Sequence, residues 1–144
     1  MKGNSEVIIV LNERLADHHT SYVECVTRAA LCDKWGYTDL EEFFEKLAKE
    51  DLESIEKLME RIVFLDGIPL LVNINEVVIG DDIYEMITFV QRSKMSRVAG
   101  YSDGIDKAVS FKDYGTRHMF EKMIVNEDEY LADIEAKITQ LERG

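Results

Sequence analysis

The sequence predicts an all-α protein built from four long helices. Apolar residues recur at three- and four-residue spacing over long stretches, and residues that start or stop helices fall between those stretches. The chain contains a single proline, as is typical of a mostly helical protein. With 144 residues and an apolar fraction of 46%, it is long enough to bury one core, so we expect one domain over residues 1–144.

Start and stop signals predict where each helix lies. The helices are expected at about residues 5–35, 39–65, 82–111 and 114–142. Ser5 is the expected N-cap of the first helix and Gly36 its stop, while Thr38 to Glu41 matches a capping box for the second. Gly67 ends the second helix, and Asp81 or Asp82 is the expected cap of the third. Whether Gly100 and Gly104 break the third helix stays open.

The connection over residues 67–80 decides the predicted topology. Fully extended, these fourteen residues reach about 46 Å at about 3.3 Å per residue. The second helix is about 40 Å long, so the connection can run the length of a bundle and make the second and third helices parallel. Lys112 and Asp113 leave room only for a tight turn. The predicted fold is therefore two antiparallel hairpins joined by a long crossover.

Composition excludes several partners. The net charge of -12 argues against nucleic acid, which requires clustered Lys and Arg. There is no run of about 18 apolar residues and no signal peptide, so we expect no membrane partner and a cytoplasmic location. Cys25 and Cys32 lie about 10.5 Å apart along one helix, too far for a disulfide, and are expected to be reduced core thiols. Trp35 is expected in the core and His118 on the surface.

Each predicted helix has a polar residue near the middle of its apolar stripe. These residues are His18, Asp51, Lys94 and Glu127, with Tyr22, Ser54 and Tyr130 about one turn away. Stacking four helices brings the first set to one level of the core. Two explanations stay open, namely a buried polar network that fixes helix register and a metal site.

The residues themselves argue against a pair of irons. Helical bundles bind two irons with Glu-x-x-His pairs, and no such pair occurs in the chain. An ammonium about 4 Å from a divalent ion costs about 8 kcal/mol at an effective dielectric constant of 20, so Lys94 opposes metal binding. A single ion held by His18, Asp51 and Glu127 stays an alternative.

Short motifs along the whole chain carry a resemblance to a known family. They are Met1-Lys2-Gly3-Asn4, Trp35-Gly36, the run from Glu60 to Pro69, Ile79-Gly80-Asp81-Asp82, Glu85-Met86, Asp113-Tyr114 and Arg117. In these residues, without gaps over nearly all of its length, the chain resembles the bacterioferritins. The resemblance implies a ferritin-like four-helix bundle, iron storage, dimers that assemble into hollow shells, and a di-iron ferroxidase centre in each subunit.

Carried over by position, the resemblance implies that this centre has lost most of its ligands. The family's glutamate on the first helix falls at His18, and the bridging glutamate and histidine of the second helix fall at Asp51 and Ser54. The third-helix glutamate falls at Lys94, and on the fourth helix the bridging glutamate is kept as Glu127 while its histidine falls at Tyr130. The tyrosine beside the centre falls at Cys25. Five of the six ligand positions are changed, so ferroxidase activity is not expected and no catalytic residue is assigned.

The resemblance also bears on haem and assembly. The methionine that holds haem at the family's dimer interface falls at Leu52, which has no donor atom, so haem is not expected. The family's short fifth helix, which lines an axis of the shell, is not expected in this chain, and the larger shell stays open. A homodimer built on the first two helices is expected.

The leading hypothesis is a bacterioferritin-like protein of iron storage or homeostasis with a degenerate ferroxidase centre. In it, Lys94 forms an ion pair with Asp51 and Glu127 in place of the irons. One alternative is a mononuclear metal or redox protein that uses His18, Asp51 and Glu127, with Tyr22, Cys25 and Tyr130 as neighbours. Another is a non-catalytic helical dimer that acts as a scaffold or as the partner of an active ferritin. No resident cofactor is expected, and iron is the one candidate.

Overall fold

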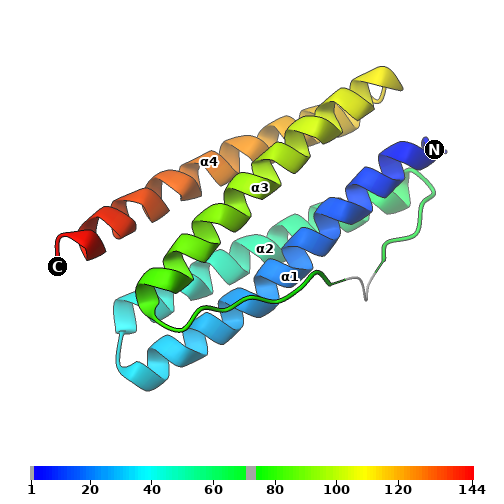
Figure 1. Cartoon of the computed structure of the whole chain (residues 1–144). Coiled ribbons are helices and arrows are strands. Elements are labelled where there is room, and N and C mark those ends of the chain that lie inside the picture. The colour runs from blue at the N-terminus through cyan, green and yellow to red at the C-terminus, as the bar shows by residue number, and fades with distance from the viewer. Residues whose placement is uncertain (1, 71–73) are drawn as a thin grey trace. The chain divides into compact units, whose positions relative to one another are not determined.

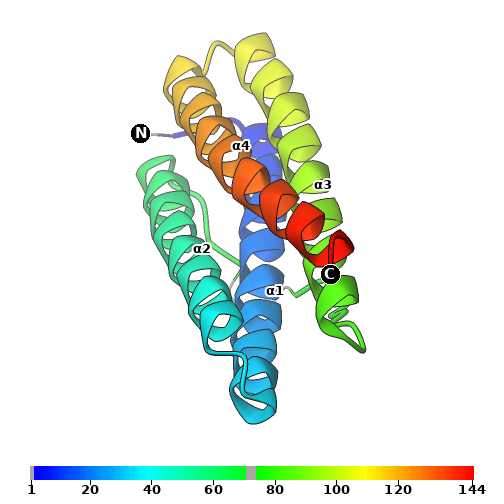
Figure 2. The same ribbon diagram turned by 90° about the vertical axis from the view of Figure 1, so that its left-hand side faces the viewer.

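The computed structural model describes residues 2–70 and 74–144 and has four α-helices and no strand in this part of the chain (Figure 1). The helices are α1 (Ser5–Trp35), α2 (Thr38–Phe64), α3 (Ile83–Ser110) and α4 (Tyr114–Glu142). They form two compact units, Met1–Ile79 with α1 and α2, and Gly80–Gly144 with α3 and α4. Within each unit the two helices run antiparallel side by side (Figures 1 and 2). A single domain over residues 1–144 stays a prediction.

The starts of α1 and α2 differ from the expected caps. Asn4 caps α1, because its side-chain oxygen accepts a hydrogen bond from the Glu6 N–H at 2.8 Å, and Ser5 is already helical. The capping box was wrong, since α2 begins at Thr38 after Tyr37, which makes no side-chain capping bond. The turn explains this. Gly36 has a left-handed φ of 81°, and the Tyr37 N–H donates to the carbonyl of residue 32 at 2.9 Å. Gly36 and Tyr37 therefore complete the end of α1, and α2 begins directly after them.

The later boundaries follow the predicted signals more closely. Asp82 caps α3 by accepting from the Glu85 N–H at 2.9 Å, and α3 runs unbroken through Gly100 and Gly104. Trp35 was wrongly expected in the core, as it is 41% exposed. It is the last residue of α1, beyond the buried stripe, which ends at Cys32.

Apolar stripes join the helices of each unit. In unit 1 the buried residues include Leu11, Leu15, Cys25 and Cys32 of α1 and Phe44, Leu47, Leu58 and Ile62 of α2. In unit 2 they include Met86, Ile87 and Tyr101 of α3 and Phe120, Met123 and Ile134 of α4. Neither cysteine forms a disulfide bond, and burial raises the pKa of the Cys32 thiol. Each fully buried Leu or Phe contributes about 1.5–3 kcal/mol to stability.

The described residues of the crossover in unit 1, 67–70 and 74–79, lie along α1, and polar contacts hold them there (Figure 1). The contacts are Asn12 to the Ile68 carbonyl and the Leu70 N–H, Asp17 and Thr20 to Asn75, Glu24 to the Val78 N–H, and Arg28 to the carbonyls of Val78 and Ile79. From Asn12 to Arg28 they cover about 24 Å of helix. The crossover's apolar side chains do not drive this contact, since Ile68 is 78% exposed and Ile74 48%.

We expect Arg28→Ala to lower the free energy of unfolding by about 2–3 kcal/mol, measured by urea denaturation. Arg28 is 2% exposed, and its Nη2 and Nε donate to the carbonyls of Val78 and Ile79 at 2.7 and 3.0 Å. Truncation leaves both carbonyls without this donor. The matched control is Thr27→Ala, because the exposed Thr27 hydroxyl bonds only to the carbonyl of Val23 in its own helix. Equal losses of unfolding free energy in the two variants would contradict the inference that Arg28 stabilises the fold through its bonds to the carbonyls of Val78 and Ile79.

Candidate functional site

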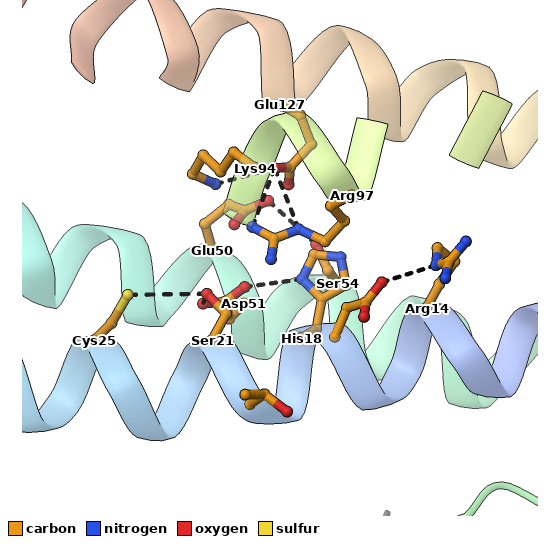
Figure 3. A network of polar contacts seen from close by, with 12 residues as sticks. Arg14, His18, Ser21, Cys25, Glu50, Asp51, Ser54, Lys94, Arg97 and Glu127 are labelled. Carbon is orange, nitrogen blue, oxygen red and sulfur yellow. Dashed lines mark hydrogen bonds and ion pairs between the residues drawn. The ribbon is translucent and has the colours of Figure 1, made fainter. Parts of the chain in front are cut away.

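Three buried side chains of unit 1 are bonded together around Asp51 (Figure 3). Asp51 of α2 is 1% exposed, and its Oδ1 lies 2.8 Å from His18 Nδ1 while its Oδ2 accepts from the Ser21 hydroxyl at 2.6 Å. An ionised carboxylate only accepts hydrogen bonds, so the His18 tautomer that fits an ionised Asp51 has its hydrogen on Nδ1 and donates a hydrogen bond to Oδ1. Both oxygens of this carboxylate therefore have a donor, as its burial requires. Cys25 Sγ lies 3.9 Å from the Ser21 hydroxyl at the edge of the group.

A second buried carboxylate adjoins Asp51. Glu50 is 7% exposed, and its Oε1 accepts from the Ser54 hydroxyl at 3.3 Å. One ligand atom from each of His18, Glu50 and Asp51 lies within 4.8 Å of the others. Imidazole nitrogen and carboxylate oxygen are common ligands of divalent metals. This group is the candidate metal site of unit 1, and it has Glu50 where the sequence predicted Glu127.

In unit 2 the side chains meet at Glu127, which two cations neutralise (Figure 3). Its Oε2 accepts from Lys94 Nζ at 3.1 Å and from Arg97 Nη2 and Nε at 3.2 and 3.3 Å. None of the three residues is more than 2% exposed. Lys94 Nζ also lies 5.0 Å from the centre of the Tyr130 ring, a cation–π contact. The predicted contact between Lys94 and Asp51 stays a prediction.

The remaining predicted residues lie outside these contacts. Tyr22 is half-buried and makes no hydrogen bond to a described residue. Leu52 is 47% exposed on α2, and His118 is exposed on α4, as expected for a surface residue.

The two groups differ in their fit to a metal ion. Glu127 would have to exchange its contacts with two cations for a metal bond, and a divalent ion about 4 Å from the Lys94 ammonium costs about 8 kcal/mol at an effective dielectric constant of 20. Unit 1 is more favourable, because His18, Glu50 and Asp51 present nitrogen and oxygen atoms in one cluster. The hydrogen bond between His18 Nδ1 and Asp51 would then give way to metal bonds. The residues therefore fit one ion in unit 1 and oppose one at Glu127.

Comparison with known proteins decides the family. The family model described as ferritin-like domain matches residues 9–144. The chain belongs to the ferritin-like family. The match, together with four helices and no strand in the described residues, confirms the predicted all-α ferritin-like fold class. None of these helices combines the length and apolar character that spanning a membrane requires.

Bacterioferritins are among the relatives of this ferritin-like chain. It is 25% identical to the bacterioferritin of Streptomyces coelicolor over 143 aligned residues, and the alignment covers 99% of this chain and 86% of the relative. It is 24% identical to the bacterioferritin of Brucella melitensis, covering 98% and 88%, and 22% identical to bacterioferritin BfrA of Mycobacterium tuberculosis, covering 99% and 90%. The protein is thus a divergent bacterioferritin-family member, and the family supports a role in iron storage or homeostasis.

Sequence reasoning missed Ser21, Glu50 and Arg97. Two of them had a signal, because Ser21 follows His18 and Arg97 follows Lys94 by three residues, which places each pair on one helix face. Glu50 had a weaker signal, since it precedes Ser54 by four residues.

We expect Lys94→Glu to destabilise the ferritin-like protein by about 3–5 kcal/mol in metal-free buffer, measured from the urea midpoint and the melting temperature. The substitution places a second carboxylate at the position that faces Glu127 and leaves Arg97 to offset the charge of both carboxylates. Lys122→Glu changes the net charge equally at an exposed position of α4 and is the control. A melting temperature of Lys94→Glu at or above wild type would contradict the buried ion pair.

Proposed function

We propose that this protein is a bacterioferritin-like subunit of iron storage or homeostasis that lacks ferroxidase activity. One observation carries the proposal. Glu127 occupies the one family ligand position that is kept, and its carboxylate is bonded to Lys94 and Arg97. In this proposal the side-chain cations of Lys94 and Arg97 neutralise the carboxylate that iron would neutralise in a di-iron centre. A single ferritin-like domain over residues 1–144 is part of this proposal.

The chemistry of iron oxidation supports it. A di-iron centre needs carboxylates that balance the charge of two metal ions placed close together. Here the third-helix position is a lysine, and the residues at the two histidine positions are Ser54 and Tyr130, which are poorer ligands for iron. Lys94 and Arg97 repel iron ions, and Ser54 and Tyr130 bind them poorly. Both effects weaken the binding of iron at this position.

The proposal also concerns partners and location. A subunit with an inactive centre can form part of a protein shell while an active ferritin subunit oxidises the iron. We propose this non-catalytic partnership as the role of the chain. The buried thiols of Cys25 and Cys32, which form no disulfide bond, support a reducing compartment such as the cytoplasm.

A mononuclear metal or redox protein is the second candidate, and the cluster of unit 1 favours it. His18, Glu50 and Asp51 supply one nitrogen and two carboxylates, and Cys25 lies at the edge of the group. A single divalent ion bound there would be held by residues of α1 and α2 alone. This candidate replaces Glu127 of the original set with Glu50.

One experiment separates the two candidates. Metal content and Fe(II) oxidation in air are measured on the untagged wild-type protein, on Asp51→Asn and on Glu50→Gln. The proposed function predicts Fe(II) oxidation no faster than in buffer and no stoichiometric metal in any of the three. One metal per chain in wild type, lost in both variants and on chelation, would establish the second candidate instead.

Restoring the family's ligands should restore oxidation. We expect the variant with His18→Glu, Asp51→Glu, Ser54→His, Lys94→Glu and Tyr130→His to oxidise Fe(II) faster than wild type by at least about tenfold, a conservative figure for regained metal catalysis. The matched control carries the other four substitutions and keeps Lys94. Equal oxidation rates in the two variants would contradict the role of Lys94 as the residue that excludes iron.

A further inference from the structure

Exposed apolar side chains gather at the turn between α3 and α4, which forms the end of unit 2 opposite the C-terminus (Figure 1). Val109, Phe111 and Tyr114 are 41%, 40% and 57% exposed. The three lie within a span of six residues, so a single partner segment can contact all of them. Apolar residues that are exposed together in this way mark an interaction surface.

The same turn is basic, although the chain as a whole is acidic. Over residues 107–118 the Lys and Arg residues are Lys107, Lys112 and Arg117, and Asp113 is the one acidic residue. The Asp113 carboxylate accepts hydrogen bonds from the backbone N–H and the hydroxyl of Thr116 at 3.0 and 2.6 Å. This acid therefore serves as the cap of α4. Since the net charge of the chain is -12, the turn is a local positive region on an acidic protein.

Lys112 has a backbone conformation that glycine adopts most easily. Its φ is 59°, in the left-handed region. Gly36 has the same place in the turn of unit 1, with a φ of 81°. In each turn the next residue donates its N–H to the carbonyl five residues back, at 2.9 Å in unit 1 and 2.8 Å in unit 2. Two turns of one form thus use glycine in one case and lysine in the other.

A lysine at that position costs backbone free energy, which indicates that its side chain has a use. In residues 2–70 and 74–144, which the structure describes, no hydrogen bond or ion pair involves the Lys112 ammonium. The use is therefore not a contact within this part of the chain. An exposed cation beside exposed rings is suited to a partner that carries the opposite charge.

We propose that the α3–α4 turn binds an acidic peptide segment of another protein, with carboxylates on its cations and an apolar side chain against its exposed rings. Lys112 and Arg117 are the cations, and Phe111 and Tyr114 are the rings. Arginine and aromatic residues are enriched where proteins bind each other, and a guanidinium holds a carboxylate through two parallel bonds. The inference does not depend on iron chemistry.

The one ion pair at the turn leaves Arg117 accessible to such a partner. Arg117 Nε lies 3.4 Å from Glu121 Oε1, and both side chains are about half exposed. Water screens a pair of this kind, so it contributes little to stability. The guanidinium can therefore exchange Glu121 for a carboxylate of the partner at small cost.

The charge of the whole chain favours a short acidic segment over an extended anionic surface. A membrane or a nucleic acid reaches beyond the turn and meets the rest of a chain that has 29 Asp and Glu against 17 Lys and Arg. Charges more than about 8 Å apart are largely screened at physiological salt. A segment that contacts only the turn is attracted by its cations, while the more distant acids are screened.

Fluorescence anisotropy tests the proposal with a labelled probe peptide of Asp and Glu residues around a central Leu-Phe pair. The peptide is titrated with full-length wild type, Lys112→Glu, Arg117→Glu, Lys112→Gly and the control Arg143→Glu. Arg143 is exposed at the other end of α4, about 39 Å along the helix from Arg117, so the control makes the same change of charge far from the turn.

We expect saturable binding to wild type that weakens as salt is added. Lys112→Glu and Arg117→Glu should each raise the dissociation constant by about tenfold or more, whereas Arg143→Glu should change it by less than about twofold. Lys112→Gly should also weaken binding, yet its melting temperature should equal or exceed that of wild type, because glycine relieves the left-handed backbone. This variant separates loss of binding from loss of folding.

Several outcomes would overturn the proposal. They are no saturable binding to wild type, unchanged dissociation constants in both reversals at the turn, and an equal loss of binding in Arg143→Glu. Stronger binding of phosphatidylglycerol vesicles or of a DNA duplex than of the peptide would assign the turn to another class of partner. A self-associated mass in native mass spectrometry that only the two reversals at the turn abolish would assign it to a second copy. Fe(II) oxidation of the same variants tests the proposed function separately and should equal that of wild type.

Discussion

The contacts inside each unit depend on one requirement, namely that the carboxylates of Glu127 and Asp51, each 1% exposed, have partners that replace the water they lose. Removing a carboxylate from water costs several kcal/mol, and the charge is tolerated only where cations or a full set of donors replace the water. Glu127 meets the requirement with Lys94 and Arg97, and Asp51 meets it with His18 and Ser21. These contacts join α3 to α4 and α1 to α2, so the buried polar residues also join the two helices of each unit.

The compensating charge at Glu127 comes from the chain itself. When a metal neutralises buried acids, part of the folding free energy comes from metal binding and depends on the metal concentration and on pH. At Glu127 the cations are the side chains of Lys94 and Arg97, which are covalent parts of the chain. The charge of this carboxylate is therefore offset without a contribution from a bound ion.

The helices could be predicted from sequence because their signals are local. Apolar spacing depends only on the helix period, and Gly36 and Asp82 act within a few residues of their own position. The capping box at Thr38 failed for a local reason too, since the left-handed Gly36 used the neighbouring residues for the end of α1. The prediction that Trp35 lies in the core was wrong. An apolar residue at the end of a helix looks like a core residue in the sequence, but fewer neighbours cover it there, and Trp35 is 41% exposed.

The candidate site was only partly predictable, because its contacts are long-range. Lys94 stood out as a cation inside an apolar stripe, yet its partner lies 33 residues away on another helix. Arg97 shares the face of Lys94, but an arginine on a helix is more often a surface residue, so sequence alone did not place it on Glu127. Glu50 and Asp51 are adjacent and both buried, which a single helical stripe does not predict, because neighbours point about 100° apart.

The residues that the proposed function assigns to the family's ligand positions agree with one another as a set. If a lysine replaced one acid and all the other ligands stayed, the site would still attract a metal ion but would hold it with too few ligands and beside a cation. Here Ser54 and Tyr130 also stand where the family has histidines, and Arg97 joins Lys94 on Glu127. Each change removes an attraction for iron or adds a contact within the chain. An uncompensated buried charge is costly, so Glu127 needs these cations wherever no metal is bound. The agreement among these residues supports the proposed function, in which side chains of the chain and not a metal neutralise Glu127.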